Sequence, residues 1–113
     1  MIRVFLVDDQ TLVRQGVRSL LELSDAVEVI GEARDGDEAI TAIPAAKPDV
    51  VLLDMRMPGK SGLEVLEILS RAGQLPPTII LTTFDEDQLV LSGLRAGARG
   101  FLLKDVSLEQ LVN

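Results

Sequence analysis

The sequence contains no cysteine, no histidine, no tryptophan and no tyrosine. Without cysteine there is no disulfide framework and no thiolate metal site. The absence of histidine removes the commonest general base and the commonest transition-metal ligand. No stretch approaches ~18 uninterrupted apolar residues, so no membrane span is predicted. The chain starts directly on a strand pattern, with no signal peptide, and we therefore expect a soluble, intracellular and cytoplasmic domain.

Length and charge limit the function classes further. The 113 residues are 47% hydrophobic but only 3% aromatic, which predicts one domain with a core of aliphatic side chains. The net charge of −7 argues against this segment itself neutralising nucleic-acid phosphates. An acidic domain of this kind is better suited to a cation or to a basic partner.

The apolar pattern predicts strands that alternate with helices. Short apolar or alternating runs favour strands at residues 2–7, 27–33, 49–53, 78–82 and 99–103. Apolar residues at helical spacing predict helices that begin at Thr11, about Asp37 and Leu63. Capping-box patterns at 85–88 and 107–110 predict the starts of a fourth and a fifth helix. The second of these helices should end before Pro44 or soon after it. The alternation predicts a doubly wound, five-stranded parallel sheet with helices on both faces.

The last predicted helix is unusually short. It begins at Ser107 and the sequence stops about two turns later, at a length that is marginal for an isolated helix. We therefore expect that this helix is truncated and that residues 1–113 form one domain of a longer protein.

Polar residues follow the predicted strands at their carboxyl ends. Asp8 and Asp9 follow the first strand, Asp54 the third, Thr82 ends the fourth and Lys104 follows the fifth. In a sheet of strand order 2-1-3-4-5 these ends share one edge, and the first and third strands are neighbours there. The three aspartates are therefore expected to converge, with Thr82 beside them and Lys104 reaching across.

Three converging carboxylates repel one another, at about 4 kcal/mol for each pair at ~4 Å and an effective dielectric constant of ~20. A protonated carboxyl or a bound hard cation would relieve the repulsion. Ligand sets of oxygen alone favour Mg²⁺ or Mn²⁺. Together with an ammonium and a hydroxyl, this set fits phosphoryl transfer to a carboxylate nucleophile.

Simpler interpretations exist for each residue alone. An aspartate after a strand often caps the following helix. A threonine suits a strand in any case, and the neighbouring Thr83 could supply the hydroxyl instead of Thr82. Phe101 alone would be a packing residue. It is the combination at several strand ends that favours chemistry.

Several motifs together carry a family resemblance over essentially the whole chain. The matching segments are 7–9, 14–16, 31–33, 48–59, 81–82, 96–105 and 107–111. With these segments the sequence resembles the receiver domain of response regulators, in particular the NarL/FixJ-type (LuxR-like) transcriptional regulators. The resemblance implies the flavodoxin-like, CheY-like fold.

The resemblance also implies roles for the clustered residues. Asp54 would be the phosphoacceptor that takes a phosphoryl group from a phosphohistidine of a sensor histidine kinase. Asp9, Asp8 partly through water, Asp54 and the backbone carbonyl of Arg56 would form the Mg²⁺ site, which Mn²⁺ can also fill. Lys104 would pair with the phosphate. Such a domain catalyses its own phosphorylation but is a signalling domain rather than a turnover enzyme.

A switch and an output are implied as well. Thr82 would move toward the phosphate, and Phe101 stands at the family's rotameric aromatic position. Self-association is expected through the fourth helix, fifth strand and fifth helix, or through the first and fifth helices. Leu89, Val90 and Leu91 are consecutive on the fourth predicted helix, so one of them should face solvent. Contact with DNA would come only through a C-terminal domain that this chain lacks.

The sequence departs from the family pattern at three places. Asp105 follows the strand-five lysine where proline is common, which puts a cis peptide bond there in doubt. Phe101 replaces the more frequent tyrosine and has no hydroxyl. Ser61 stands where an aspartate is frequent, so the preceding loop could be capped differently.

Three alternatives remain open. A pseudo-receiver would keep the fold and act without phosphorylation, although the presence of Asp9 and Lys104 disfavours it. A Mg²⁺-dependent phosphatase with an aspartate nucleophile needs an acid two residues later, where this chain has Arg56. A flavodoxin-like cofactor binder would need aromatic side chains to stack a flavin, and the chain has neither tryptophan nor tyrosine.

Overall fold

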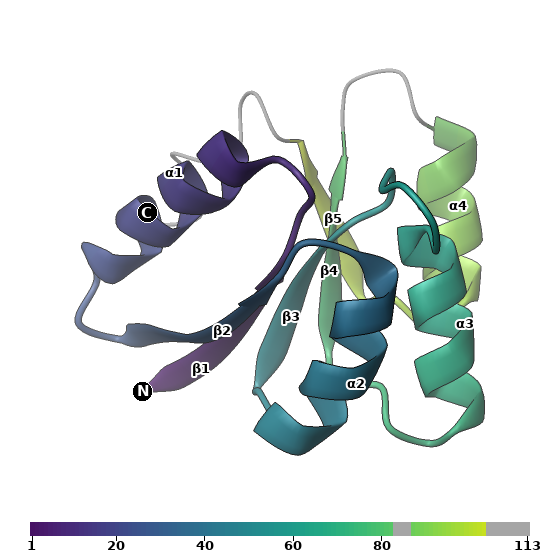
Figure 1. Cartoon of the computed structure of the whole chain (residues 1–113), viewed down its shortest axis with the longest axis horizontal. Coiled ribbons are helices and arrows are strands. Elements are labelled where there is room, and N and C mark those ends of the chain that lie inside the picture. The colour runs from purple at the N-terminus through teal and green to yellow at the C-terminus, as the bar shows by residue number, and fades with distance from the viewer. Residues whose placement is uncertain (83–86, 104–113) are drawn as a thin grey trace.

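The computed structural model describes residues 1–82 and 87–103, which form one five-stranded sheet. The strands are β1 (Ile2–Val7), β2 (Val27–Ala33), β3 (Val50–Asp54), β4 (Thr78–Thr82) and β5 (Gly100–Leu103). All pairings are parallel, and the spatial order is β2-β1-β3-β4-β5 (Figure 1). The predicted fold class and strand order are confirmed.

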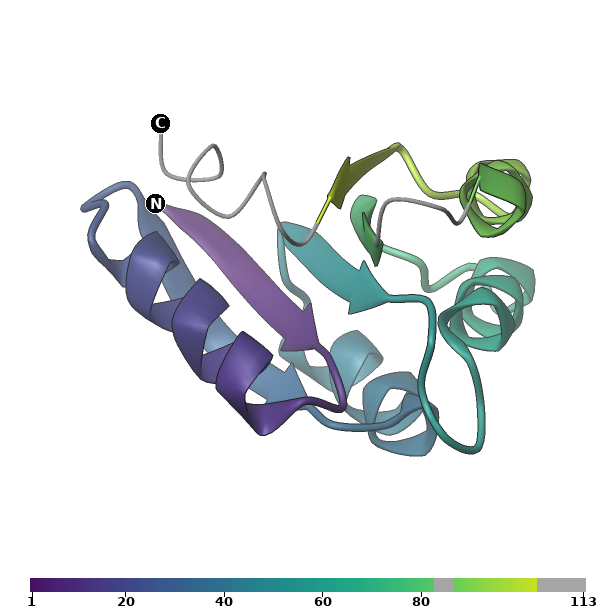
Figure 2. The same ribbon diagram turned by 90° about the horizontal axis from the view of Figure 1, so that it is seen from above.

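Four helices cover the two faces of the sheet in the described part of the chain. They are α1 (Thr11–Glu22), α2 (Gly36–Ala46), α3 (Gly62–Arg71) and α4 (Asp87–Arg95). The view from above shows α1 on one face and α2, α3 and α4 on the other (Figure 2). The helix predicted from Ser107 and the capping box predicted at 85–88 lie outside the described residues.

The sheet separates two hydrophobic clusters, which explains why its central strands read as continuous apolar runs. The larger cluster joins Phe5, Val7, Val51 and Leu53 to α2, α3 and α4, whereas the smaller one joins alternate strand residues to Val17 and Leu21 of α1. Because β1 and β3 are covered on both faces, the residues at their carboxyl ends are fixed by packing.

Helix α2 continues through Pro44 and ends at Ala46. Proline has no N–H to donate to the preceding turn, so α2 lacks one helical hydrogen bond at Pro44 and ends two residues later. Lys47 then adopts a left-handed conformation, with φ 51°, and its N–H donates to the carbonyl of Ile43 at 3.0 Å. Of the two predicted end points, the one shortly after Pro44 is correct.

Caps fix both ends of α3 and the end of α4. The Ser61 side chain accepts a hydrogen bond from the N–H of Glu64, and the Glu64 side chain accepts one from the N–H of Ser61. Ser61, where the family often has aspartate, therefore forms a complete capping box. Gly73 and Gly97 follow the two helices with positive φ angles, as the left-handed cap requires.

Strand β2 carries a register shift that its sequence does not reveal. Val4 pairs with Val29, but the next residue, Phe5, pairs with Gly31, so Ile30 is an extra residue in β2. A Cβ atom on Gly31 would lie 2.6 Å from the Phe5 ring, so glycine is required where the strands come together again. The expected simple alternation of residues 27–33 is therefore wrong beyond Val29.

The exposed side of α4 agrees with the prediction for the apolar triplet 89–91. Leu91 is 47% exposed, whereas Leu89 packs against the larger cluster, so one residue of the apolar triplet does face solvent. Within the described ranges, every helix is too short or too polar to span a bilayer.

Candidate functional site

Three aspartates meet at the carboxyl edge of the sheet. Val7 and Leu53 are register partners at the ends of adjacent strands, so Asp8 and Asp54 follow side by side. Carboxylate oxygens of Asp8, Asp9 and Asp54 lie within 4.8 Å of one another. We call these three residues the acid cluster. The convergence predicted from the strand ends is confirmed.

The acid cluster is largely removed from solvent. Asp8 is 2% exposed and Asp54 is 4% exposed, while Asp9 is partly buried. Negative groups are seldom buried this deeply without compensation, because desolvation and mutual repulsion both disfavour their charged forms. A cation is the compensation that three oxygen donors on two neighbouring strand ends can share.

Each buried carboxylate also accepts a local backbone hydrogen bond. The N–H of Gln10 donates to Oδ1 of Asp8 at 2.8 Å, and the N–H of Arg56 donates to Oδ1 of Asp54 at 3.2 Å. Both aspartates thus stabilise the turns that leave their strands, as the simple capping interpretation expects. Capping alone gives no reason for two such turns to bring a third carboxylate into the same space.

The turn after β1 is held by charged residues to which the sequence patterns assigned no role. Nη1 of Arg14 donates to the backbone carbonyl of Asp8 at 2.8 Å, and Nε of Arg14 donates to Oε1 of Glu32 at 3.0 Å. Glu32 also binds Arg18, which pairs with Glu22 one turn later in α1. The hydrogen bond to Glu22 and, to a smaller extent, the hydrogen bond to Glu32 raise the pKa of the Arg18 guanidinium. No periodicity places Glu32 opposite α1, because the extra residue in β2 intervenes.

The loop between β3 and α3 is pinned on its inner side. Met55 and Met57 are buried, and the N–H of Gly62 donates to the carbonyl of Met55 at 3.1 Å. A Cβ atom on Gly62 would lie 2.4 Å from the carbonyl oxygen of Asp54, so α3 begins in direct contact with the end of β3. This packing fixes the backbone on both sides of Arg56.

A salt bridge ties the same loop to α2 from outside. Nζ of Lys60 lies 2.8 Å from Oδ1 of Asp37, in the first turn of α2. The hydrogen bond to Asp37 raises the pKa of the exposed Lys60 ammonium. The loop is thus anchored at both of its ends.

The other candidate residues have different placements. Thr82 is 2% exposed at the end of β4, one position beyond the residue that pairs with Asp54. Phe101 is 50% exposed on β5. Lys104, Thr83 and Asp105 lie outside the described residues, so their predicted contributions stay predictions. The structure brings the three aspartates together and sets Thr82 at the same edge.

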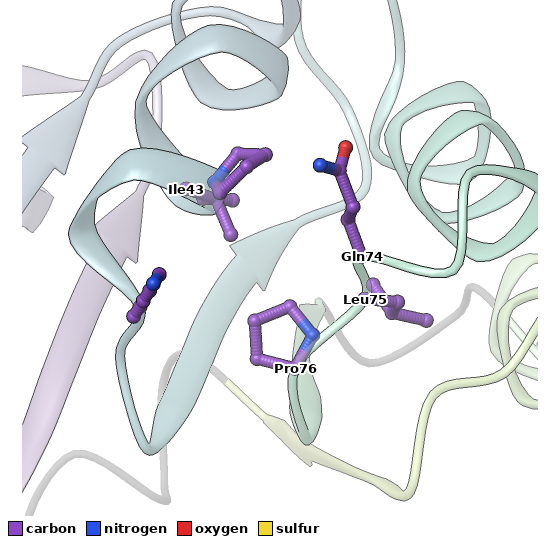
Figure 3. A pocket seen from close by; sticks show the side chains of 6 residues that line it. Ile43, Gln74, Leu75 and Pro76 are labelled. Atoms are coloured by element: carbon purple, nitrogen blue, oxygen red, sulfur yellow. The ribbon is translucent and has the colours of Figure 1, made fainter.

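One groove lies on the same side of the sheet as the acid cluster, and one pocket lies at the opposite edge. A groove of about 530 Å³ lies along the loop that follows Asp54 and is lined by Met55, Arg56, Met57, Pro58, Ser61 and Leu89. A pocket of about 330 Å³ at the amino-terminal edge of the sheet is lined by Ile43, Pro44, Lys47, Gln74, Leu75 and Pro76 (Figure 3). Its segments precede β3 and β4, so it is separate from the acid cluster.

The donor set fits a hard divalent cation. Three carboxylates supply only oxygen, and partial exposure of Asp9 leaves room for the water ligands that Mg²⁺ retains. The chain has no histidine or cysteine, the donors that zinc prefers.

Comparisons with known proteins agree with this geometry. Residues 4–113 match the family model of the response regulator receiver domain. The nitrate/nitrite response regulator protein NarP of Escherichia coli is 46% identical over 97% of this chain and 51% of that protein. The transcriptional regulatory protein YdfI of Bacillus subtilis is 42% identical over 96% of this chain and 51% of that protein. The chain thus spans about half the length of these curated relatives.

A solved structure extends the likeness to three dimensions. The signal receiver domain of the NarL response regulator of Mycobacterium tuberculosis superposes with a TM-score of 0.90 at 41% sequence identity. The match covers 98% of this chain and 90% of that chain.

Proposed function

Because the chain belongs to the response regulator receiver domain family, we propose that it is the phosphoacceptor domain of a two-component transcriptional regulator, with Asp54 as the acceptor. The observation that carries the proposal is the acid cluster: a buried carboxylate at the end of a central strand, within 4.8 Å of two others. The full-length regulator would bind DNA through a domain beyond residues 1–113.

In this proposal, Asp8, Asp9, Asp54 and the backbone carbonyl of Arg56 hold Mg²⁺, or Mn²⁺ in its place. The bound ion would offset the negative charge of the incoming phosphoryl oxygens. The hydrogen bond from Gln10 to Asp8 keeps the first turn in place. The hydrogen bond from the Gly62 N–H to the Met55 carbonyl and the close packing of Gly62 keep the turn after β3 in place.

The transfer itself uses a carboxylate oxygen of Asp54. That oxygen forms a bond to phosphorus while the bond from phosphorus to an imidazole nitrogen of the kinase's phosphohistidine breaks. The electron pair of the broken bond stays on the nitrogen. The hydrogen bond from the Arg56 N–H holds the Asp54 carboxylate in one orientation, and such orientation would supply much of the rate.

Lys104 and Thr82 complete the proposed site. Lys104 directly follows β5, and its ammonium would pair with a phosphoryl oxygen. The Thr82 hydroxyl would donate to another oxygen, and its shift would let Phe101 turn from its half-exposed position into the sheet edge. A local gain of charge would thereby change an outer surface.

Two partners follow from this function. A sensor histidine kinase would supply the phosphoryl group, and the proposed place of this reaction is the cytoplasm. A second copy of the chain would pack on α4, β5 and the fifth predicted helix, or on α1 and that helix. Both surfaces carry exposed apolar side chains, with Leu91, Leu94 and Phe101 on the first and Leu12 of α1 on the second.

The test is the intact mass of the domain after incubation with acetyl phosphate and Mg²⁺. We expect a gain of one phosphoryl group that is absent with EDTA and absent from Asp54→Asn. Asp35→Asn is the matched control, because Asp35 caps α2 through the N–H of Glu38. Folded wild-type protein that gains no mass would contradict phosphoacceptor function and favour an interaction module that acts unphosphorylated.

A further inference from the structure

A chain of three contacts links the edge strand of the sheet to the acid cluster. Glu32 on β2 accepts from Nε of Arg14 on α1 at 3.0 Å, and Nη1 of Arg14 donates to the carbonyl of Asp8 at 2.8 Å. The N–H of Asp8 donates to the carbonyl of Ala33 at 3.1 Å. The peptide groups on both sides of Asp8 are thereby tied to neighbouring residues of β2.

These contacts leave little freedom to the turn that carries Asp8 and Asp9. The carboxylate of Asp8 is fixed as well, since its Oδ1 accepts from the N–H of Gln10 at 2.8 Å. The Arg14 side chain is only 15% exposed and that of Glu32 is 26% exposed, so water competes weakly for the link. The planar guanidinium has two donors set to bind both oxygens at once, which a lysine cannot reproduce.

The link depends on the extra residue in β2. Val29 pairs with Val4 and faces α1 in the smaller cluster, so strict alternation would turn Gly31 and Ala33 toward α1 and Glu32 away from it. After the shift, Glu32 pairs with Leu6, which faces α1, and Ala33 pairs with Val7, which faces the larger cluster. The shift thus turns Glu32 toward the arginines.

From this arrangement we propose that Arg14 is a positioning residue of the acid cluster, held in place by Glu32. It fixes the Asp8 peptide, so the oxygens of Asp8 and Asp9 are already oriented when a divalent cation binds. This inference rests on the proposed function for its purpose and on the hydrogen bonds for its geometry. Removal of such an outer contact commonly lowers metal affinity by about tenfold or more.

The experiment compares Arg14→Gln, Arg14→Lys and Arg18→Gln with the wild-type domain. Arg18→Gln is the matched control, because Arg18 also lies on α1 and also binds Glu32, but its second hydrogen bond is to Glu22 where that of Arg14 is to the Asp8 carbonyl. The first readout is the dissociation constant of Mg²⁺ by calorimetry. The second is the hydrogen-exchange protection of the Gln10 amide in metal-free buffer, measured by NMR.

We expect Arg14→Gln to weaken Mg²⁺ binding about tenfold and to lower the protection of the Gln10 amide, while amides near Leu21 keep theirs. Arg14→Lys should recover part of both effects, and Arg18→Gln should leave the Mg²⁺ constant within about twofold. A lower unfolding free energy of Arg14→Gln with unchanged Mg²⁺ affinity and unchanged Gln10 protection would overturn the proposal.

The two readouts separate this inference from the proposed function. If the wild-type domain binds no Mg²⁺ and gains no phosphoryl group, the proposed function fails. Arg14 would still be supported as the residue that holds the turn if Arg14→Gln alone releases the Gln10 amide. If all variants protect that amide equally, the inference fails even where phosphorylation of Asp54 succeeds.

Discussion

Replacing Asp54 by asparagine should stabilise the metal-free domain. Each pair of unit charges at 4.8 Å interacts by about 3.5 kcal/mol at an effective dielectric constant of ~20, and Asp54 takes part in two such pairs. Screening around the partly exposed Asp9 and the loss of a charge-assisted hydrogen bond from the Arg56 N–H both reduce the gain. We expect a net increase of about 1–3 kcal/mol in the free energy of unfolding.

The assay is urea unfolding in EDTA at pH 7, followed by far-ultraviolet circular dichroism because the chain has no tryptophan or tyrosine. Added Mg²⁺ should narrow the difference in the free energy of unfolding between the two proteins. At ten times its dissociation constant it stabilises the wild-type domain by about 1.4 kcal/mol, and Asp54→Asn should gain less. The difference in metal-free buffer should shrink in 1 M salt, because screening weakens the repulsion.

Asp35→Asn again serves as the matched control. Its carboxylate caps α2 and is not one of the three carboxylates of the acid cluster, and asparagine caps a helix about as well, so the unfolding free energy should change by less than about 0.5 kcal/mol. A loss of stability in Asp54→Asn without metal would refute the reasoning. Asp54 would then act mainly as a structural cap, and repulsion within the acid cluster would be negligible.

Three further substitutions test the site and its supports. Asp9→Ala should abolish measurable Mg²⁺ binding in calorimetry, and an unchanged affinity would place the metal elsewhere. Gly31→Ala should lower the free energy of unfolding by about 1–3 kcal/mol, since the added Cβ would lie 2.6 Å from the Phe5 ring; no change in a urea titration would mean that Phe5 moves freely. Ser61→Ala should cost about 1 kcal/mol by breaking the capping box with Glu64, and a midpoint equal to that of the wild type would contradict the cap's contribution.

Most of the architecture was predictable because its signals are local. Buried parallel strands read as short apolar runs, and the glycines that end α3 and α4 mark their helices without knowledge of the fold. The convergence of Asp8 and Asp54 also followed from the sequence, because adjacent parallel strands must end at a common edge. The placement of these residues is confirmed, and their roles as phosphoacceptor and metal ligands stay proposals.

Local patterns in the sequence specify the strands, the helices and the strand ends that carry the aspartates, since each depends on a few consecutive residues. The direction in which Glu32 faces depends on strand pairing, because one extra residue in β2 reverses the alternation and no local pattern marks it. The contact from Arg14 to the Asp8 carbonyl depends on that reversal. Long-range register therefore sets how firmly the acid cluster is held, although short-range pattern sets where it lies.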